Sequence, residues 1–109
     1  MSMEARIKAA VAPVVPEVYA NGYKGDAPIY CTFTTTEVPD GFGNNRAHAV
    51  RYLVQLHLFL PYRTDPYEKK VGLRRAIIAA GFTTPTITNA SDDEDQHYVF
   101  EFESVDGDV

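Results

Sequence analysis

The sequence has a single cysteine and no long apolar run, and each absence excludes a class of protein. One thiol, Cys31, cannot form an intramolecular disulfide, which is expected in a reducing compartment or in a protein that needs no bridges. No stretch approaches the roughly 20 apolar residues of a membrane span. The apolar segment 9–15 is interrupted by Pro13, is followed by Pro16 and lacks the layout of a signal peptide, so we expect a cytoplasmic protein.

An excess of basic residues is also missing. The 109 residues include 10 Lys and Arg against 15 Asp and Glu, and the formal net charge is −5. A chain of this sign is not drawn to nucleic acid or to an anionic membrane by its overall charge. The basic residues are not interleaved with stacking aromatics as in a nucleic-acid platform. The length fits one domain of ordinary globular composition, and we expect a single domain over residues 1–109.

No signature of a nucleophile or a metal centre is present either. The histidines His48, His57 and His97 form no His-x-x-x-His pair. His48 and His57 are on one predicted strand, on opposite faces and about 30 Å apart, so we interpret the histidines as residues of a strand surface. Cys31 falls on the apolar side of another predicted strand, which indicates a buried, inert thiol.

Two polar segments resemble ligand loops only superficially. The acidic run 92–95 lacks the Asp-x-Asp-x-Asp-Gly spacing and the distal Glu of an EF-hand, so we expect a solvated turn. Gly41-Phe42-Gly43 is not a phosphate loop, because no Lys-Ser/Thr follows it and no helix begins there. An exposed Phe42 between two glycines either folds back on the body or inserts into a partner. We therefore expect no catalytic residues, no cofactor and no metal.

The strongest pattern is a long strand followed by a well-delimited helix. From His48 to Leu60 apolar and polar residues alternate, which is the period of a half-buried strand. Pro61 ends that strand. The helix predicted over 65–81 begins with Asp65 as N-cap, Pro66 as its first residue and Glu68 completing a capping box. Gly81 is a typical stop signal.

The other elements are shorter. A helix is predicted over residues 1–12, with Ser2 as its cap and an apolar face made of Ala5, Ala9 and Ala12 with Ile7 and Val11 nearby. The further predictions are a short extended piece over 14–19, a strand over 28–37, a loop over 38–46, an edge strand over 83–88 and a last strand over 97–105, with residues 106–109 frayed. The order of elements predicts an α+β domain: a mainly antiparallel sheet of about four strands, with both helices packed on one face. Its two hairpins span residues 28–60 and 83–105.

The hairpin over residues 28–60 is too long for a compact body. A strand of about 13 residues rises roughly 43 Å at about 3.3 Å per residue. A compact chain of this length has a diameter of only about 34 Å. The hairpin should therefore project, and Leu53 and Phe59 would leave apolar groups on its outer face. We infer that a neighbouring subunit covers that face. The candidate protein-interaction residues are Asp40, Phe42, Asn44, Asn45, Arg46, Arg51, Leu53 and Phe59.

One family shares this arrangement. The strand 51–61 leads into a basic helix with Lys69, Lys70 and Arg74, which closes with the sequence Ala-Gly-Phe at 80–82. An acidic turn then precedes the alternating strand 98–102. Over residues 28–103 this pattern resembles the small tail-terminator or tail-completion proteins of long-tailed bacteriophages and prophages.

The resemblance implies a structural, non-enzymatic function. Such a protein forms a ring, expected to be a hexamer, that caps the assembled tail tube and joins it to the head. Its partners are its own copies, the tail-tube protein and the head-completion or connector protein, and its final location is the virion, after assembly in the host cytoplasm. DNA must pass through the ring, and a net negative charge suits a lumen that does not retain it. Sequence-specific nucleic-acid binding and membrane binding are not expected.

Two alternatives stay open. The chain could be another component of the head–tail connector, with the same fold and ring symmetry. It could instead be a small cytoplasmic enzyme or ligand-binding α+β domain with a site on the open face of the sheet. The second alternative predicts a concave cluster of convergent polar residues with shifted pKa values.

Overall fold

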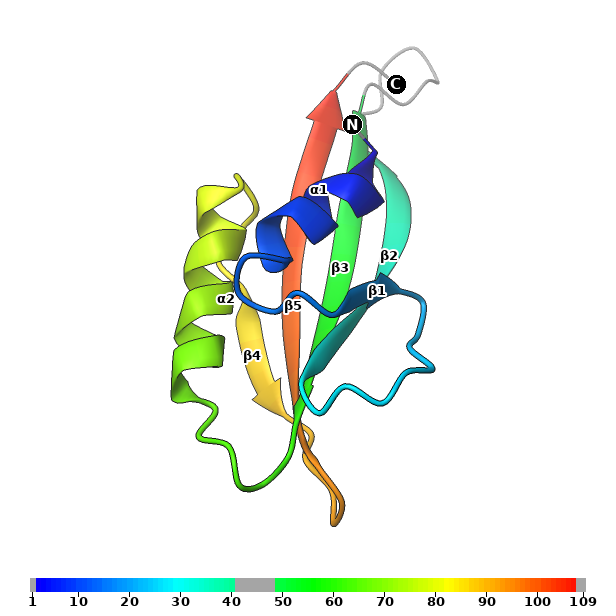
Figure 1. Cartoon of the computed structure of the whole chain (residues 1–109). Helices are drawn as coiled ribbons and strands as arrows, with labels where there is room; N and C mark the ends of the chain where they lie inside the picture. Colours follow the sequence, from blue (N-terminus) through cyan, green and yellow to red (C-terminus); the bar gives the residue numbers. More distant parts are fainter. Residues whose placement is uncertain (1, 41–48, 108–109) are drawn as a thin grey trace.

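A mixed five-stranded sheet with two helices on one face forms the whole structure (Figure 1). The computed structural model describes residues 2–40 and 49–107. The elements in chain order are α1 (Met3–Val11), β1 (Val18–Ala20), β2 (Tyr30–Asp40), β3 (Ala49–Leu60), α2 (Tyr67–Ala79), β4 (Thr86–Asn89) and β5 (Gln96–Gly107). The predicted α+β class, with two helices and a mainly antiparallel sheet, is therefore confirmed.

Strand β3 is the centre of the sheet, as its long alternating pattern suggests. It pairs antiparallel with β2 on one side, from Ala49 to Phe59, and with β5 on the other, from Ala49 to Leu60. Strand β4 pairs with β5 at one edge, in keeping with Pro85 just before it. At the other edge β1 pairs parallel with β2, with Val18 opposite Cys31. The sequence analysis expected only an extended piece here, because three residues are too few to show a strand period.

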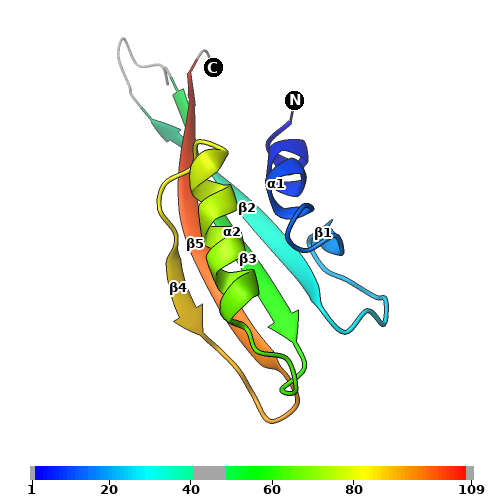
Figure 2. The ribbon, with the colours of Figure 1, turned by 60° about the vertical axis from the view of Figure 1, so that its left-hand side comes forward.

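The molecule is elongated, with extents of 55 × 25 × 23 Å. At the hairpin end β2, β3 and β5 run on past the end of α2 (Figure 2). The expectation of a two-stranded ribbon was wrong, because Gly107 of β5 pairs with Ala49 of β3 and the projecting part has three strands. The expected fraying from Asp106 onward was also wrong for residues 106 and 107, because pairing with β3 holds them in β5.

The core lies between the sheet and the two helices. The β3 residues that point toward the helices are fully or almost fully buried: Val54, Leu56, Leu58 and Leu60. In α1 the buried residues are Met3, Ile7 and Val11, whereas Ala9 is exposed. The prediction was therefore wrong for Ala9, whereas Ile7 and Val11 are buried as expected and Ala12 packs against the core. The longer side chains remove more apolar area from water, so they decide which side of the helix packs on the sheet.

Helix α2 ends just before the predicted Gly81, but it begins one residue later than predicted: Pro66 is at the N-cap position without a side-chain cap, and Tyr67 is the first helical residue. The Asp65 Oδ1 atom accepts a hydrogen bond of 3.0 Å from the backbone N–H of Tyr67. Gly81 adopts φ = +93°, and its backbone N–H donates to the carbonyl of Ile78 at 3.0 Å. The helical run itself is Tyr67–Ala79, shorter than the predicted 65–81. Leu73 and Ile77 are its buried residues, whereas the apolar side chains of Tyr67 and Ile78 are exposed.

Candidate functional site

No helix of the described chain covers the face of the sheet opposite α1 and α2, and we call it the open face. The pairing register places its residues in cross-strand rows. One row joins Tyr30, Phe59 and His97, and the next joins Thr32, His57 and Val99. The two rows after these are Thr34, Gln55, Glu101 and Thr86, then Thr36, Leu53 and Glu103. One end of the open face is thus aromatic and the middle is polar.

At the aromatic end five rings stack in a continuous series, which we call the aromatic row: Tyr19, Tyr23, Tyr30, Phe59 and His97. Successive ring centroids lie 4.8, 4.6, 4.8 and 4.3 Å apart. The Tyr19 hydroxyl also donates a hydrogen bond to Glu17, which is the main reason that its pKa is raised. Burial, with a smaller contribution from the charge of Asp95, raises the pKa of Tyr30. The rings pack against one another and form an apolar strip at this end of the open face.

Two histidines lie at the end of this row. His57 Nδ1 and His97 Nε2 are 2.8 Å apart, a hydrogen bond in which one ring donates and the other accepts. Burial lowers the pKa of both imidazoles, and the neighbouring His97 lowers that of His57 further. The charges of Glu101, near His57, and Asp92, near His97, act in the opposite direction. At neutral pH the pair is therefore favoured in its uncharged form.

The sequence analysis did not pair these histidines. They are 40 positions apart on different strands, so no local spacing in the sequence links them. One signal in the sequence points to the pair: the alternation of β3 and of β5 places both histidines on the face away from the core. The two strands are neighbours in the sheet. His48 lies outside the described residues. Within the described ranges, no group of three or more His, Cys, Asp or Glu side chains could hold a metal ion.

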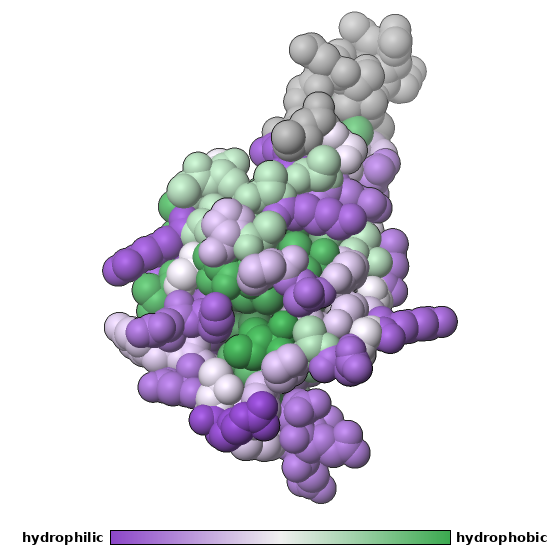
Figure 3. All heavy atoms as spheres, viewed as in Figure 1, coloured by the Kyte–Doolittle hydropathy of each residue, from purple (hydrophilic) through white to green (hydrophobic). Residues whose placement is uncertain are grey.

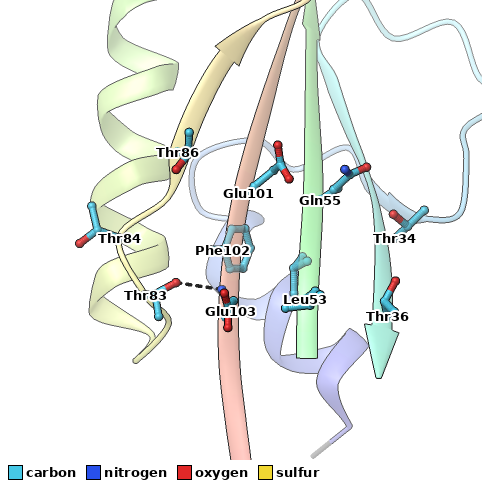
Figure 4. A pocket seen from close by; sticks show the side chains of 11 residues that line it. Thr34, Thr36, Leu53, Gln55, Thr83, Thr84, Thr86, Glu101, Phe102 and Glu103 are labelled. Carbon is cyan, nitrogen blue, oxygen red and sulfur yellow. Dashed lines mark hydrogen bonds between the residues drawn. The ribbon is translucent and has the colours of Figure 1, made fainter. Parts of the chain in front are cut away.

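The polar middle of the open face is hollowed (Figure 4). The hollow has a volume of about 500 Å³ and is bordered by strands β2, β3 and β5 and by the segment 83–86. Its lining is mainly Thr, Gln and Glu, with Leu53 between them. At one side the Thr83 hydroxyl accepts a hydrogen bond of 2.9 Å from the backbone N–H of Glu103. The Glu103 carboxylate lies 3.6 Å from the Arg51 guanidinium, and both side chains are partly exposed.

A second, shallower hollow of about 360 Å³ lies on the other side of the molecule, between α2 and β4. Its walls are apolar, from Pro66, Tyr67, Val71 and Ile87, with Lys70 and Arg74 also lining it. The Lys70 ammonium lies 4.4 Å from the centre of the Tyr98 ring. The view from the helix side shows hydrophobic residues gathered between the helices, with hydrophilic side chains around them (Figure 3).

The predicted interaction residues fall into two groups. Phe42, Asn44, Asn45 and Arg46 lie outside the described residues. Asp40 is the last residue of β2, opposite Ala49, so the predicted loop over 38–46 begins later than expected. The outward phase of β3 places Arg51, Leu53 and Phe59 together on the open face, and all three side chains are partly buried.

Two other predicted features have the simple structural roles expected of them. Cys31 is fully buried, and burial raises the pKa of its thiol to about 12. In the acidic turn, Asp92 Oδ1 accepts hydrogen bonds from the backbone N–H groups of Glu94 and Asp95 at 2.9 and 3.0 Å. These hydrogen bonds lower the pKa of Asp92. In the described part of the chain, no helix is long and apolar enough to cross a membrane.

Comparison with known proteins supports the fold and goes no further. No protein-family model matches the sequence, and no curated protein gives a match. Eighteen chains of solved structures are similar. One of these, whose name states no function, covers 97% of this chain and 90% of its own length, with a TM-score of 0.64 and 12% sequence identity. At that identity the likeness defines a fold shared over nearly the whole chain.

Proposed function

We propose that this chain is a structural, non-enzymatic subunit that assembles with copies of itself into a ring. The ring closes the tail tube of a long-tailed bacteriophage or prophage and joins it to the head. The observation that carries the proposal is the open face. It presents Leu53, Phe59 and the aromatic row on a side of the sheet that the described chain leaves uncovered. Contiguous apolar surface on the outside of a subunit commonly marks a protein–protein contact.

The fold gives this proposal further support. The alternation of helices and strand pairs is the one that underlies the resemblance to tail-terminator proteins, with β1 as an addition. The 55 Å long axis gives the subunit two distant ends. A ring of such subunits has two rims, and these rims would contact the tail-tube protein and the head-completion protein. Another component of the head–tail connector would use the same surfaces. Identifying the protein bound at each rim distinguishes a tail terminator from such a component.

Electron microscopy of the purified protein, alone and mixed with tail tubes, tests the proposal. We expect rings, and tubes whose ends are capped. The variant Leu53→Lys places a charge on the open face and should abolish both. Ala9→Lys is the matched control, because Ala9 is exposed on α1 and away from the open face. The proposal fails if the protein is strictly monomeric at high concentration and leaves tube ends bare.

The hollow on the open face supports a second candidate, a binding site for a small polar ligand. Its Thr, Gln and Glu lining offers hydrogen-bonding groups within one concavity. A thermal-shift screen of small polar metabolites tests this reading. A stabilising compound whose effect is lost in Glu101→Gln would favour it, and a screen without such a compound would leave the assembly function as the better account.

A further inference from the structure

The outer surface of α2 is unusual for a helix at the surface of a monomer. Tyr67 is 68% exposed and Ile78 is 44% exposed, although both are large and apolar. Tyr67 and Val71 line the shallow hollow beside β4, where Ile87 adds a further apolar wall. Exposed apolar side chains that adjoin a hollow indicate a contact surface.

The same helix carries positive charge on a negative protein. It holds four of the chain's 10 Lys and Arg residues, Lys69, Lys70, Arg74 and Arg75, and one acid, Glu68. Arg74 and Arg75 are exposed, and within the described residues neither forms an ion pair. A partner for this surface should therefore be acidic as well as partly apolar.

The open face of another copy has these properties. Its central hollow contains Glu101, which is exposed and makes no ion pair among the described residues, and Glu103, whose ion pair with Arg51 is only partly exposed. Leu53 supplies apolar surface in the same hollow. The volume of about 500 Å³ gives room for side chains from a helix surface, which is convex. The two surfaces thus match in shape, in charge and in apolar content.

We propose that α2 of one subunit packs, through Tyr67, Val71 and Arg74, into the open-face hollow of the next subunit. This inference rests on the proposed self-assembly and names the surfaces that carry it. The added helix covers the bare side of the neighbour's sheet, so the sheet lies between two helical layers. The two surfaces are different parts of the subunit, on opposite sides of the sheet (Figure 2). A head-to-tail contact of this kind generates a ring when its rotation closes.

A symmetric contact between two open faces is the main competitor. When its two-fold axis passes through the hollow, such a contact brings Glu101 and Glu103 of one copy against the same residues of the other. Like charges opposed across an interface are unfavourable, so charge selects the contact with α2.

Thiol crosslinking between copies tests the contact directly. The variant Arg74→Cys/Glu101→Cys has one new thiol on each surface, at positions that are exposed in the subunit. Cys31 does not interfere, because it is buried and its pKa is raised to about 12. A short bis-maleimide should convert the concentrated double variant into a ladder of covalent oligomers. Lys8→Cys/Glu101→Cys is the matched control, with its helix thiol on α1, and should give no ladder.

Each other outcome overturns the proposal. Crosslinked dimers from Glu101→Cys alone would show that two open faces meet. Equal ladders from the test and control variants would show random collision. A double variant that sediments as an oligomer, or as a monomer, without forming a ladder would show that this contact does not exist.

A charge exchange gives a second readout that does not depend on thiols. Arg74→Glu and Glu101→Arg should each reduce the oligomeric fraction at least tenfold, and the two changes combined should restore most of it. Tail-capping assays separate this inference from the proposed function. A ladder without capped tubes would support the contact and contradict the phage function. Capped tubes without a ladder would support the phage function and contradict the contact.

Discussion

Replacing Phe59 with alanine should destabilise the subunit by about 2–4 kcal/mol. Phe59 stacks between Tyr30 and His97, with ring centroids 4.8 and 4.3 Å away. Each aromatic pair adds about 0.5–1.5 kcal/mol beyond its buried area, so the two pairs contribute about 1–3 kcal/mol. The lost apolar area adds to this, but the total stays below the upper end of the roughly 3–5 kcal/mol typical of a fully buried Phe, because Phe59 is only partly buried.

Urea unfolding followed by circular dichroism measures this change. With a slope of about 1–3 kcal/mol per molar urea, the midpoint should fall by about 1 M or more. Measurement at two protein concentrations separates subunit stability from assembly. Phe59→Leu retains apolar area without a ring and should give a smaller loss than Phe59→Ala.

Thr32→Ala is the control for the same surface. Thr32 lies on the open face beside the aromatic row and has no ring, so its replacement should change stability by less than about 1 kcal/mol. A loss below about 1 kcal/mol for Phe59→Ala, or equal stability of Phe59→Leu and the parent protein, would refute the stacking argument.

Three further predictions concern protonation, reactivity and packing. Burial lowers the folded-state pKa of His57 and His97 below the unfolded value of about 6.5. The contribution of the two neutral imidazoles to the free energy of unfolding is therefore complete above about pH 6.5 and is lost as the pH falls through the folded-state pKa values. The urea midpoint should therefore drop between pH 7.5 and 5, and His57→Gln/His97→Gln should flatten the drop; an unchanged slope would contradict the assignment. Cys31 should react with maleimide at least 100-fold more slowly in the folded protein than in urea, and rapid labelling without urea would show an open core. Ile7→Ala should lose about 2–5 kcal/mol in urea unfolding whereas Ala9→Ser loses less than about 1, and equal losses would place the wrong face of α1 against the sheet.

Much of the fold could be predicted because its signals are local. The alternation in β3 separates buried Val54 and Leu56 from Leu53 and Phe59 on the opposite face. Asp65 and Gly81 mark the ends of α2 through backbone rules that need no tertiary contact.

The candidate site was predicted only in part. The phase of one strand places Arg51, Leu53 and Phe59 on the face away from the core, and Leu53 and Phe59 stand out there because they break its polar pattern. The aromatic row was missed, since it joins residues of five segments of the chain. Tyr23, for example, lies in a connection between strands and has no periodicity to signal its place beside Tyr19 and Tyr30.

The sequence by itself determined the types of elements, their order and the side of each long strand that faces the core, because periodicity and capping act within a few residues. Only the tertiary structure decided which strands became neighbours, that β1 joined the sheet in parallel, and that His57 met His97. It also decided which side of each helix was buried, through the competition of side chains for the same apolar space. Strand register and helix packing depend on contacts between distant segments, and no local pattern in the chain encodes them.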